Sequence, residues 1–217
     1  GATTKWGGGA VDGCQVLFQG NTITGNGGSG VYIDSSSDEN GSSFTVQDNT
    51  ISGNNVYGLY FGSMSYGAYL GVLGNTIEDN SDEGVYVSNL TNGSDCIVTD
   101  NTIDGNGYGI YVDYATDGCL LDIEDNIVTG SLSGVGIYCG REFLDSELKV
   151  LGNTISDNAG IGLQLCPDGG NLDSSLADSR ATVRCNTISG NSSWGISAYI
   201  YRALVDISGN HITGNGE

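Results

Sequence analysis

Apolar and polar residues alternate over short segments of this chain, and the alternating segments recur at gaps of 24 to 33 residues. Alternation with a period of two is typical of a β-strand that has one buried face. Each segment is followed by the tripeptide Asn-Thr-Ile or a close variant, whose first residue we call the anchor. The eight anchors are Asn21, Asn49, Asn75, Asn101, Asn126, Asn153, Asn186 and Asn210. Self-similarity at this period predicts a stacked repeat architecture.

Each repeat contains three segments with strand character. Around the anchor Asn49, apolar residues stand five and three positions before it, at Phe44 and Val46, and two after it, at Ile51. A Gly-aliphatic-Tyr segment follows, and a polar loop then leads to the next repeat. Three strands and three turns predict one coil of a parallel β-solenoid, in which each strand pairs in register with its equivalent in the next coil. The anchor then lies at a corner, where Asn tolerates left-handed backbone and bonds to the Asn of the next coil.

This pattern resembles the right-handed parallel β-helix repeat family of the pectate-lyase-like superfamily, with its NosD-type and carbohydrate-binding repeats. The resemblance is carried by Asn49-Thr-Ile-Ser-Gly-Asn with Gly58-Leu-Tyr and by the copies at Asn101 and Gly109, and it covers about residues 14–215. It implies one all-β domain, 1–217, that is a single-stranded right-handed parallel β-helix of about eight coils of three short strands. Members include polysaccharide lyases, hydrolases, epimerases, adhesins and surface-layer components, so the fold alone says little about function.

The two ends of the sequence carry no pattern of a capping element. Residues 1–13 are Gly-rich and cannot form an amphipathic capping helix, and the sequence ends shortly after the last repeat turn. Because uncovered strand edges template further pairing, we expect end-to-end contacts between copies, giving a homopolymer.

The net charge is −20, with only six Lys and Arg among 217 residues. Binding to nucleic acid or to an anionic membrane needs clustered cations, so neither is expected as a partner. A surface of this charge favours cations such as Ca²⁺, and acidity also keeps an exposed protein soluble. No apolar stretch is long enough to insert into a membrane. We therefore predict no resident cofactor, with Ca²⁺ as the ion that the surface would attract.

Candidate chemistry lies on one outward strand face. A lyase of this family would be expected to carry Ca²⁺-binding acids and an Arg or Lys base on such a face. The candidates are Asp122 and Glu124, which alternate outward in one strand, and Arg184, which stands two before its anchor and also points outward. The alternative is that these residues belong to the ordinary exposed face of an acidic protein. The pattern alone therefore predicts no catalytic or metal site.

A column of tyrosines is the most distinctive surface feature. Each follows the inward aliphatic residue of the third strand and should therefore point outward. The members are Tyr32, Tyr60, Tyr86, Tyr111 and Tyr138. Three readings stay open: a ladder that stabilises the sheet, an assembly interface, and a platform for sugars.

Six cysteines are an even number, which suits disulfides in an oxidising compartment. Cys139 and Cys166 both lie 13 residues after their anchors and form the preferred pair, with Cys96 and Cys119 as a second candidate pair. Cys14 and Cys185 are either free or bonded to another subunit. Glycosylation sequons begin at Asn40, Asn89, Asn92 and Asn191.

These features favour a secreted, self-assembling structural protein of a cell surface, sheath or extracellular filament. The alternatives are a carbohydrate-active enzyme, either a polysaccharide lyase or a glycoside hydrolase, and a passive glycan-binding module that uses the tyrosine column.

Overall fold

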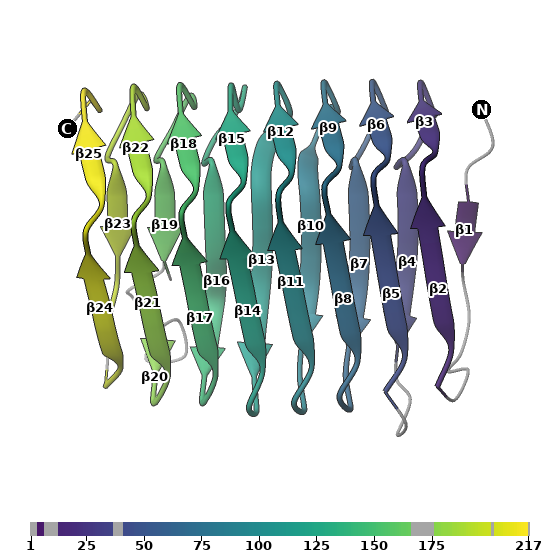
Figure 1. The fold of residues 1–217 in the computed structure, drawn as a ribbon, viewed down its shortest axis with the longest axis horizontal. Helices are drawn as coiled ribbons and strands as arrows, with labels where there is room; N and C mark the ends of the chain where they lie inside the picture. The colour runs from purple at the N-terminus through teal and green to yellow at the C-terminus, as the bar shows by residue number, and fades with distance from the viewer. Residues whose placement is uncertain (1–3, 7–12, 37–40, 166–175, 201, 217) are drawn as a thin grey trace.

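The computed structural model describes residues 4–6, 13–36, 41–165, 176–200 and 202–216. The described residues form a rod of parallel strands without helices (Figure 1), which confirms the predicted parallel β-solenoid. The strands lie in three sheets that run the length of the rod, here named sheets A, B and C. Sheets B and C each contain eight strands, one from each repeat, in agreement with the predicted number of coils.

Sheet A carries the Gly-aliphatic-Tyr segments. Its order is β1-β4-β7-β10-β13-β16-β19-β23, and β20 pairs with the end of β16. The strands are β1 (Thr4–Trp6), β4 (Val31–Ser36), β7 (Leu59–Met64), β10 (Glu83–Leu90), β13 (Tyr108–Thr116), β16 (Ile137–Leu144), β19 (Leu163–Leu165), β20 (Leu176–Ala177) and β23 (Ile196–Ala198).

Sheets B and C meet at the anchor asparagines. Sheet B holds the alternating segments before each anchor: β2 (Gln15–Gln19), β5 (Ser43–Gln47), β8 (Tyr69–Leu73), β11 (Asp95–Thr99), β14 (Leu120–Glu124), β17 (Glu147–Leu151), β21 (Arg180–Arg184) and β24 (Leu204–Ser208). Sheet C holds three-residue strands after each anchor: β3 (Thr22–Thr24), β6 (Thr50–Ser52), β9 (Thr76–Glu78), β12 (Thr102–Asp104), β15 (Ile127–Thr129), β18 (Thr154–Ser156), β22 (Thr187–Ser189) and β25 (His211–Thr213).

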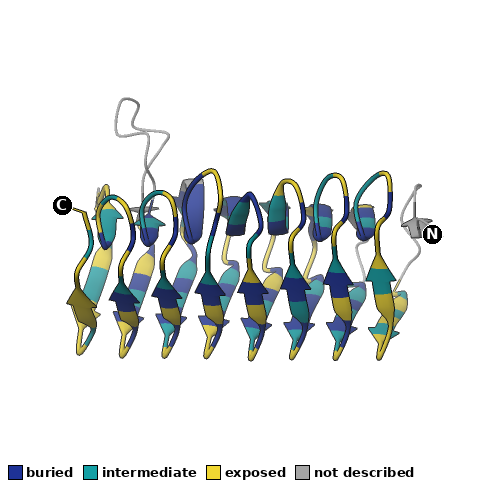
Figure 2. Ribbon diagram, turned by 90° about the horizontal axis from the view of Figure 1, so that it is seen from above, coloured by how far each residue is buried: buried dark blue, intermediate teal, exposed yellow. Residues whose placement is uncertain are grey.

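The core is built from like residues stacked on like. The apolar columns predicted from the alternation are buried through the middle coils, where Val46, Ile51 and Leu70 are fully inaccessible to solvent. Bands of buried residues recur at the same level in successive strands (Figure 2). Since each strand is paired with its equivalent in the next coil, one register places every repeated residue in a column along the rod.

The corners on both sides of sheet C use left-handed backbone. The residue before each anchor has positive φ in all eight repeats, and so does the residue four positions after it. Most of these residues are Gly or Asp, which tolerate that conformation. The sequence analysis assigned the left-handed φ to the anchor itself, and this was wrong. The left-handed residue comes directly before the anchor, and the turn that it makes directs the Asn side chain inward.

Candidate functional site

The anchor asparagines form a continuous hydrogen-bonded ladder, as predicted. The backbone N and the Nδ2 of every anchor but the last donate to Oδ1 of the anchor in the next coil, at 2.9–3.0 Å. Nδ2 also donates to a carbonyl in the preceding coil, as from Asn75 to Val46 at 2.8 Å. Each inner anchor therefore ties three coils together, and a buried amide with these bonds is satisfied.

A second asparagine ladder runs along the other edge of sheet C, and the sequence analysis missed it. Its members stand five residues after the anchors, and their Nδ2 atoms donate to the next Oδ1 at 2.8 Å. The available signal was the recurrent Gly-Asn or Asp-Asn pair that we assigned only to a turn. The members are Asn26, Asn54, Asn80, Asn106, Asn158, Asn191 and Asn215.

Ser131 interrupts this second ladder. Its backbone N still donates to Asn158 Oδ1 at 3.0 Å, but its buried Oγ has no hydrogen-bond partner. Asn106, in the preceding coil, donates to the carbonyls of Ile77 and Asp104 and, within the described residues, has no amide partner in the coil of Ser131. The serine side chain is too short to bridge the two asparagines, so one rung of the ladder is absent.

Small residues fill a column at the third corner, between sheets A and B. The residue seven before each anchor is Ser, Ala or Cys, and Ser hydroxyls accept from the backbone of the preceding coil, as Ser146 Oγ does from Cys119 N at 3.2 Å. Cys14 and Cys119 both belong to this column. Cys119 Sγ donates to the Thr116 carbonyl at 3.0 Å, so its thiol acts as a serine hydroxyl would.

The predicted disulfide between Cys96 and Cys119 is not formed. Cys96 is a buried core residue opposite Leu121 rather than Cys119, and both thiols are free. Cys139 is buried opposite Leu165. Its pairing with Cys166 stays a prediction. Cys166 itself lies outside the described residues. Cys14 and Cys185 are free, which leaves a bond to another subunit as a prediction.

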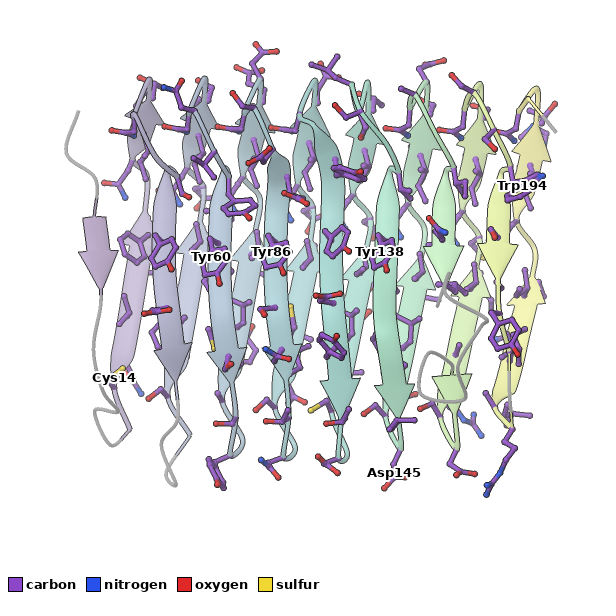
Figure 3. All side chains as sticks on the ribbon, turned by 180° about the vertical axis from the view of Figure 1, so that it is seen from behind. Cys14, Tyr60, Tyr86, Tyr138, Asp145 and Trp194 are labelled. Carbon is purple, nitrogen blue, oxygen red and sulfur yellow. The ribbon has the colours of Figure 1, made fainter. Side chains whose placement is uncertain are left out.

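The five tyrosines lie at one register position of sheet A and point outward, as predicted. Tyr60, Tyr86 and Tyr138 stand at one level across the sheet in Figure 3. Their rings stack nearly parallel, with centroid separations of 4.5, 5.3, 5.4 and 4.1 Å along the series from Tyr32 to Tyr138. Each inner ring is covered on both faces by neighbouring rings, so it offers no open face on which a sugar could stack.

Two further tyrosines extend this ladder. The Tyr57 ring lies 5.2 Å from both Tyr60 and Tyr86, and Tyr108 meets Tyr111 edge-on at 6.0 Å. Burial, followed by the charge of Glu83, raises the pKa of Tyr57 to about 12. Burial, followed by the charge of Asp113, raises the pKa of Tyr86 to about 12. The phenols of Tyr57 and Tyr86 therefore stay neutral well into the alkaline range.

The candidate catalytic residues lie on the outer face of sheet B. Asp122 pairs in register with Lys149, and the pKa of Asp122 is raised by burial, against the charge of Lys149. Lys149 itself lies 3.8 Å from the carboxylate of Glu147. Glu124 is exposed and shares the face of Asp122, as predicted. Asp122 therefore faces a lysine in the next coil, and Glu124 faces Leu151.

Arg184 points outward, as predicted, and forms an ion pair with Asp206 on the adjacent strand β24. The hydrogen bond from Arg184 holds the pKa of the Asp206 carboxyl below its ordinary value. The two side chains border a shallow hollow that Arg180, Thr182 and Leu204 complete. Arg184 lies two strands from Glu124, with Leu151 between them in the register, so the predicted acids and base are near neighbours on one face without touching.

The sequons differ in their access to solvent. Asn92 is exposed in a turn, and Asn89 is half-buried on β10. Asn191 is 1% exposed, and its Nδ2 donates to Asn215 and to Ile155, so the prediction of a glycan there is contradicted by burial in the second ladder. Asn40 lies outside the described residues.

In the part of the chain that the structure describes, no three His, Cys, Asp or Glu side chains gather as a metal site would require. The same residues include no helix of the length and apolarity needed to cross a lipid bilayer.

Comparison with protein families identifies the fold class. The family model described as "Right handed beta helix region" matches residues 5–144. This chain belongs to the right-handed β-helix family. The comparisons with curated proteins and with solved structures gave no match. Membership of the right-handed β-helix family confirms the resemblance drawn from the repeats, and the fold alone specifies no function.

Proposed function

We propose that this chain is a structural protein that associates with copies of itself in an extracellular layer, sheath or filament. The observation that carries the proposal is that the repeated side chains make contacts between neighbouring coils. Both asparagine ladders and the tyrosine ladder bind one coil to the next along the axis. Bonds in this direction resist bending and separation of coils, which is the property that a load-bearing rod needs.

A lateral contact through sheet C fits this role. Its outward side chains form two ranks in register, at the positions one and three after each anchor. Most carry hydroxyl groups, and flat faces of identical residues in register pack against one another in β-assemblies. The rank one after the anchors is Thr22, Thr50, Thr76, Thr102, Ile127, Thr154, Thr187 and His211. The rank three after them is Thr24, Ser52, Glu78, Asp104, Thr129, Ser156, Ser189 and Thr213.

Charge sets the conditions for such association. With a net charge of −20, and with Glu78 and Asp104 on the contact face, copies repel one another at low ionic strength. Salt screens this repulsion, and Ca²⁺ neutralises carboxylates directly. We therefore expect association to increase with ionic strength and more steeply with Ca²⁺.

Sedimentation and electron microscopy of the purified protein test the proposal. The double variant Thr102→Lys/Thr154→Lys places two cations on the face of sheet C, and we expect it to remain monomeric under conditions in which the parent protein associates. The control is Thr45→Lys/Thr182→Lys on the outer face of sheet B, which makes the same change in net charge. Both variants lower the overall repulsion between copies by the same change in net charge. Loss of association in the sheet C variant alone would therefore indicate a contact through sheet C. A parent protein that stays monomeric at every salt and Ca²⁺ concentration would overturn the proposal.

A glycan-binding or glycan-cleaving role is the second candidate, and the hollow at Arg180, Arg184 and Asp206 is the observation that favours it. Guanidinium and carboxylate groups on a shallow face suit the hydroxyls and carboxylates of a polysaccharide. A panel of neutral and acidic polysaccharides, assayed for binding and for cleavage, tests this role. Binding that Arg180→Ala abolishes, in a protein that does not associate, would favour the glycan role over the structural one.

A further inference from the structure

The tyrosine ladder brings pairs of oxidisable rings into contact across coil boundaries. Two pairs are closer than the others: Tyr111 and Tyr138, with centroids 4.1 Å apart and planes 6° apart, and Tyr32 and Tyr60, at 4.5 Å and 5°. In two parallel rings related by a translation along the rod, equivalent atoms lie about as far apart as the centroids. The ring carbons next to the two hydroxyls therefore face each other within each close pair.

We propose that Tyr32–Tyr60 and Tyr111–Tyr138 are sites of oxidative cross-linking, at which a one-electron oxidant joins adjacent coils through dityrosine. Each phenol loses one electron and its hydroxyl proton. The two radicals then form a carbon–carbon bond between the ring positions next to the oxygens, and the ring hydrogens at those positions move to the oxygens and restore both phenols. In total, two tyrosines release two electrons and two protons, and a peroxide or persulfate that takes up the two electrons balances the reaction.

Access of the oxidant does not require contact with every ring. Tyr138 is only 7% exposed, whereas the other rings of the ladder are half-buried. Since consecutive rings are 4.1–5.4 Å apart, an electron vacancy created at one ring can pass along the stack to another. Burial, followed by the nearby charge of Asp34, raises the pKa of Tyr32, so its phenol is neutral before oxidation at neutral pH.

The middle rings of the ladder should couple less. Tyr60 and Tyr86 are 5.3 Å apart, Tyr86 and Tyr111 are 5.4 Å apart, and the Tyr57 ring packs against both Tyr60 and Tyr86. The longer separation and the extra ring hold these carbons apart. The structure thus specifies which of several adjacent pairs should react, and this selectivity distinguishes the proposal from general tyrosine oxidation.

The test uses the folded protein with its exposed Cys185 thiol alkylated, illuminated with a ruthenium tris-bipyridyl complex and persulfate. Dityrosine is followed by its fluorescence, and digestion with an Asp-specific protease and mass spectrometry locate the cross-linked peptides, which have lost two hydrogen atoms. We expect intramolecular products that join Tyr111 to Tyr138 and Tyr32 to Tyr60.

Conservative variants make the result decisive. Tyr138→Phe keeps a ring in the stack but removes the phenol, so we expect the Tyr111–Tyr138 product to fall to background while the Tyr32–Tyr60 product is unchanged. Tyr60→Phe should do the reverse, and Tyr199→Phe, outside the ladder, should change neither. Tyr66 and Tyr199 are 49% and 39% exposed. If solvent exposure rather than ring contact decided which tyrosines couple, the products would therefore contain these two residues. Products at those two residues, products only between copies, or the same products in urea-unfolded protein would overturn the proposal.

Discussion

Replacement of Ser131 by Asn should complete the second asparagine ladder and stabilise the protein. In each intact rung, backbone N and Nδ2 of one Asn donate to Oδ1 of the next, and Nδ2 also donates to a carbonyl of the preceding coil. At Ser131 only the backbone bond to Asn158 is present. An Asn at this position would accept from Asn106 and donate to Asn158, and the gap that it fills spans two strand spacings, about 9.6 Å.

The expected gain follows from the number of new bonds. An acceptance from the Asn106 backbone N, one donation to Asn158 and one to a backbone carbonyl make three new bonds, each contributing a net 0.5–1.5 kcal/mol as an order of magnitude. The donation from Asn106 Nδ2 replaces its present bond to the Asp104 carbonyl and adds no further bond. Ordering the longer side chain costs about 1 kcal/mol. We therefore expect a gain of about 2 kcal/mol in the free energy of unfolding, or a rise of roughly 4–8 °C in Tm for a chain of this length.

Thermal and denaturant unfolding, followed by circular dichroism, measure this change. Asn80→Ser is the mirror-image control, because it makes the same gap where the ladder is intact, and it should lower Tm by at least as much. If Ser131→Asn leaves Tm unchanged or lowers it while Asn80→Ser destabilises, then the slot at Ser131 does not accept an amide and the reasoning from the register is wrong.

Other features of the rod give three further predictions. Cys185 has φ 57° in a column otherwise formed by Gly and Asp, so Cys185→Gly should raise stability by about 1 kcal/mol; Gly152→Cys in the same column, where an added Cβ would lie 2.2 Å from Asp125 Oδ1, should lower it in the same unfolding assay. Tyr57 and Tyr86 have pKa values of about 12 in the fold against 10.0 when unfolded, so their contribution to stability is complete below pH 10 and is lost as the pH rises from about 10 to about 12. Ultraviolet titration should show the phenols of Tyr57 and Tyr86 ionising near pH 12, and complete ionisation of both near pH 10 in folded protein would contradict this. Expression through a glycosylating secretory pathway should modify Asn92 and leave the buried Asn191 unmodified, as peptide mass spectrometry will report.

The repeats in the sequence were enough to predict the fold. A fixed period and an alternating pattern determine which residues share a column, so the core, the anchor ladder and the outward tyrosines followed from counting positions. The same counting failed for the candidate pair Cys96 and Cys119, which stand five and seven residues before their anchors. Cys96 lies opposite Leu121 in the register rather than opposite Cys119, and both thiols are free.

The sequence analysis was least informative about the roles of side chains at the surface. Outward tyrosines were compatible with stacking, sugar binding or assembly, and only the ring geometry shows that their faces pack against one another. Likewise, Asp122 and Arg184 were correctly placed on one face, but the residues opposite them that set their charge environment, Lys149 and Asp206, come from neighbouring coils. Asn191 shows the same limit, since a sequon motif carries no information about burial.

Electron microscopy of the protein, imaged in its native setting and after purification in Ca²⁺ and salt, tests the proposed structural role most directly. The account predicts rods packed side by side into filaments or sheets, with their long axes parallel and their packing lost in Thr102→Lys/Thr154→Lys. Dispersed single rods under all of these conditions, together with binding or turnover of a polysaccharide, would contradict it.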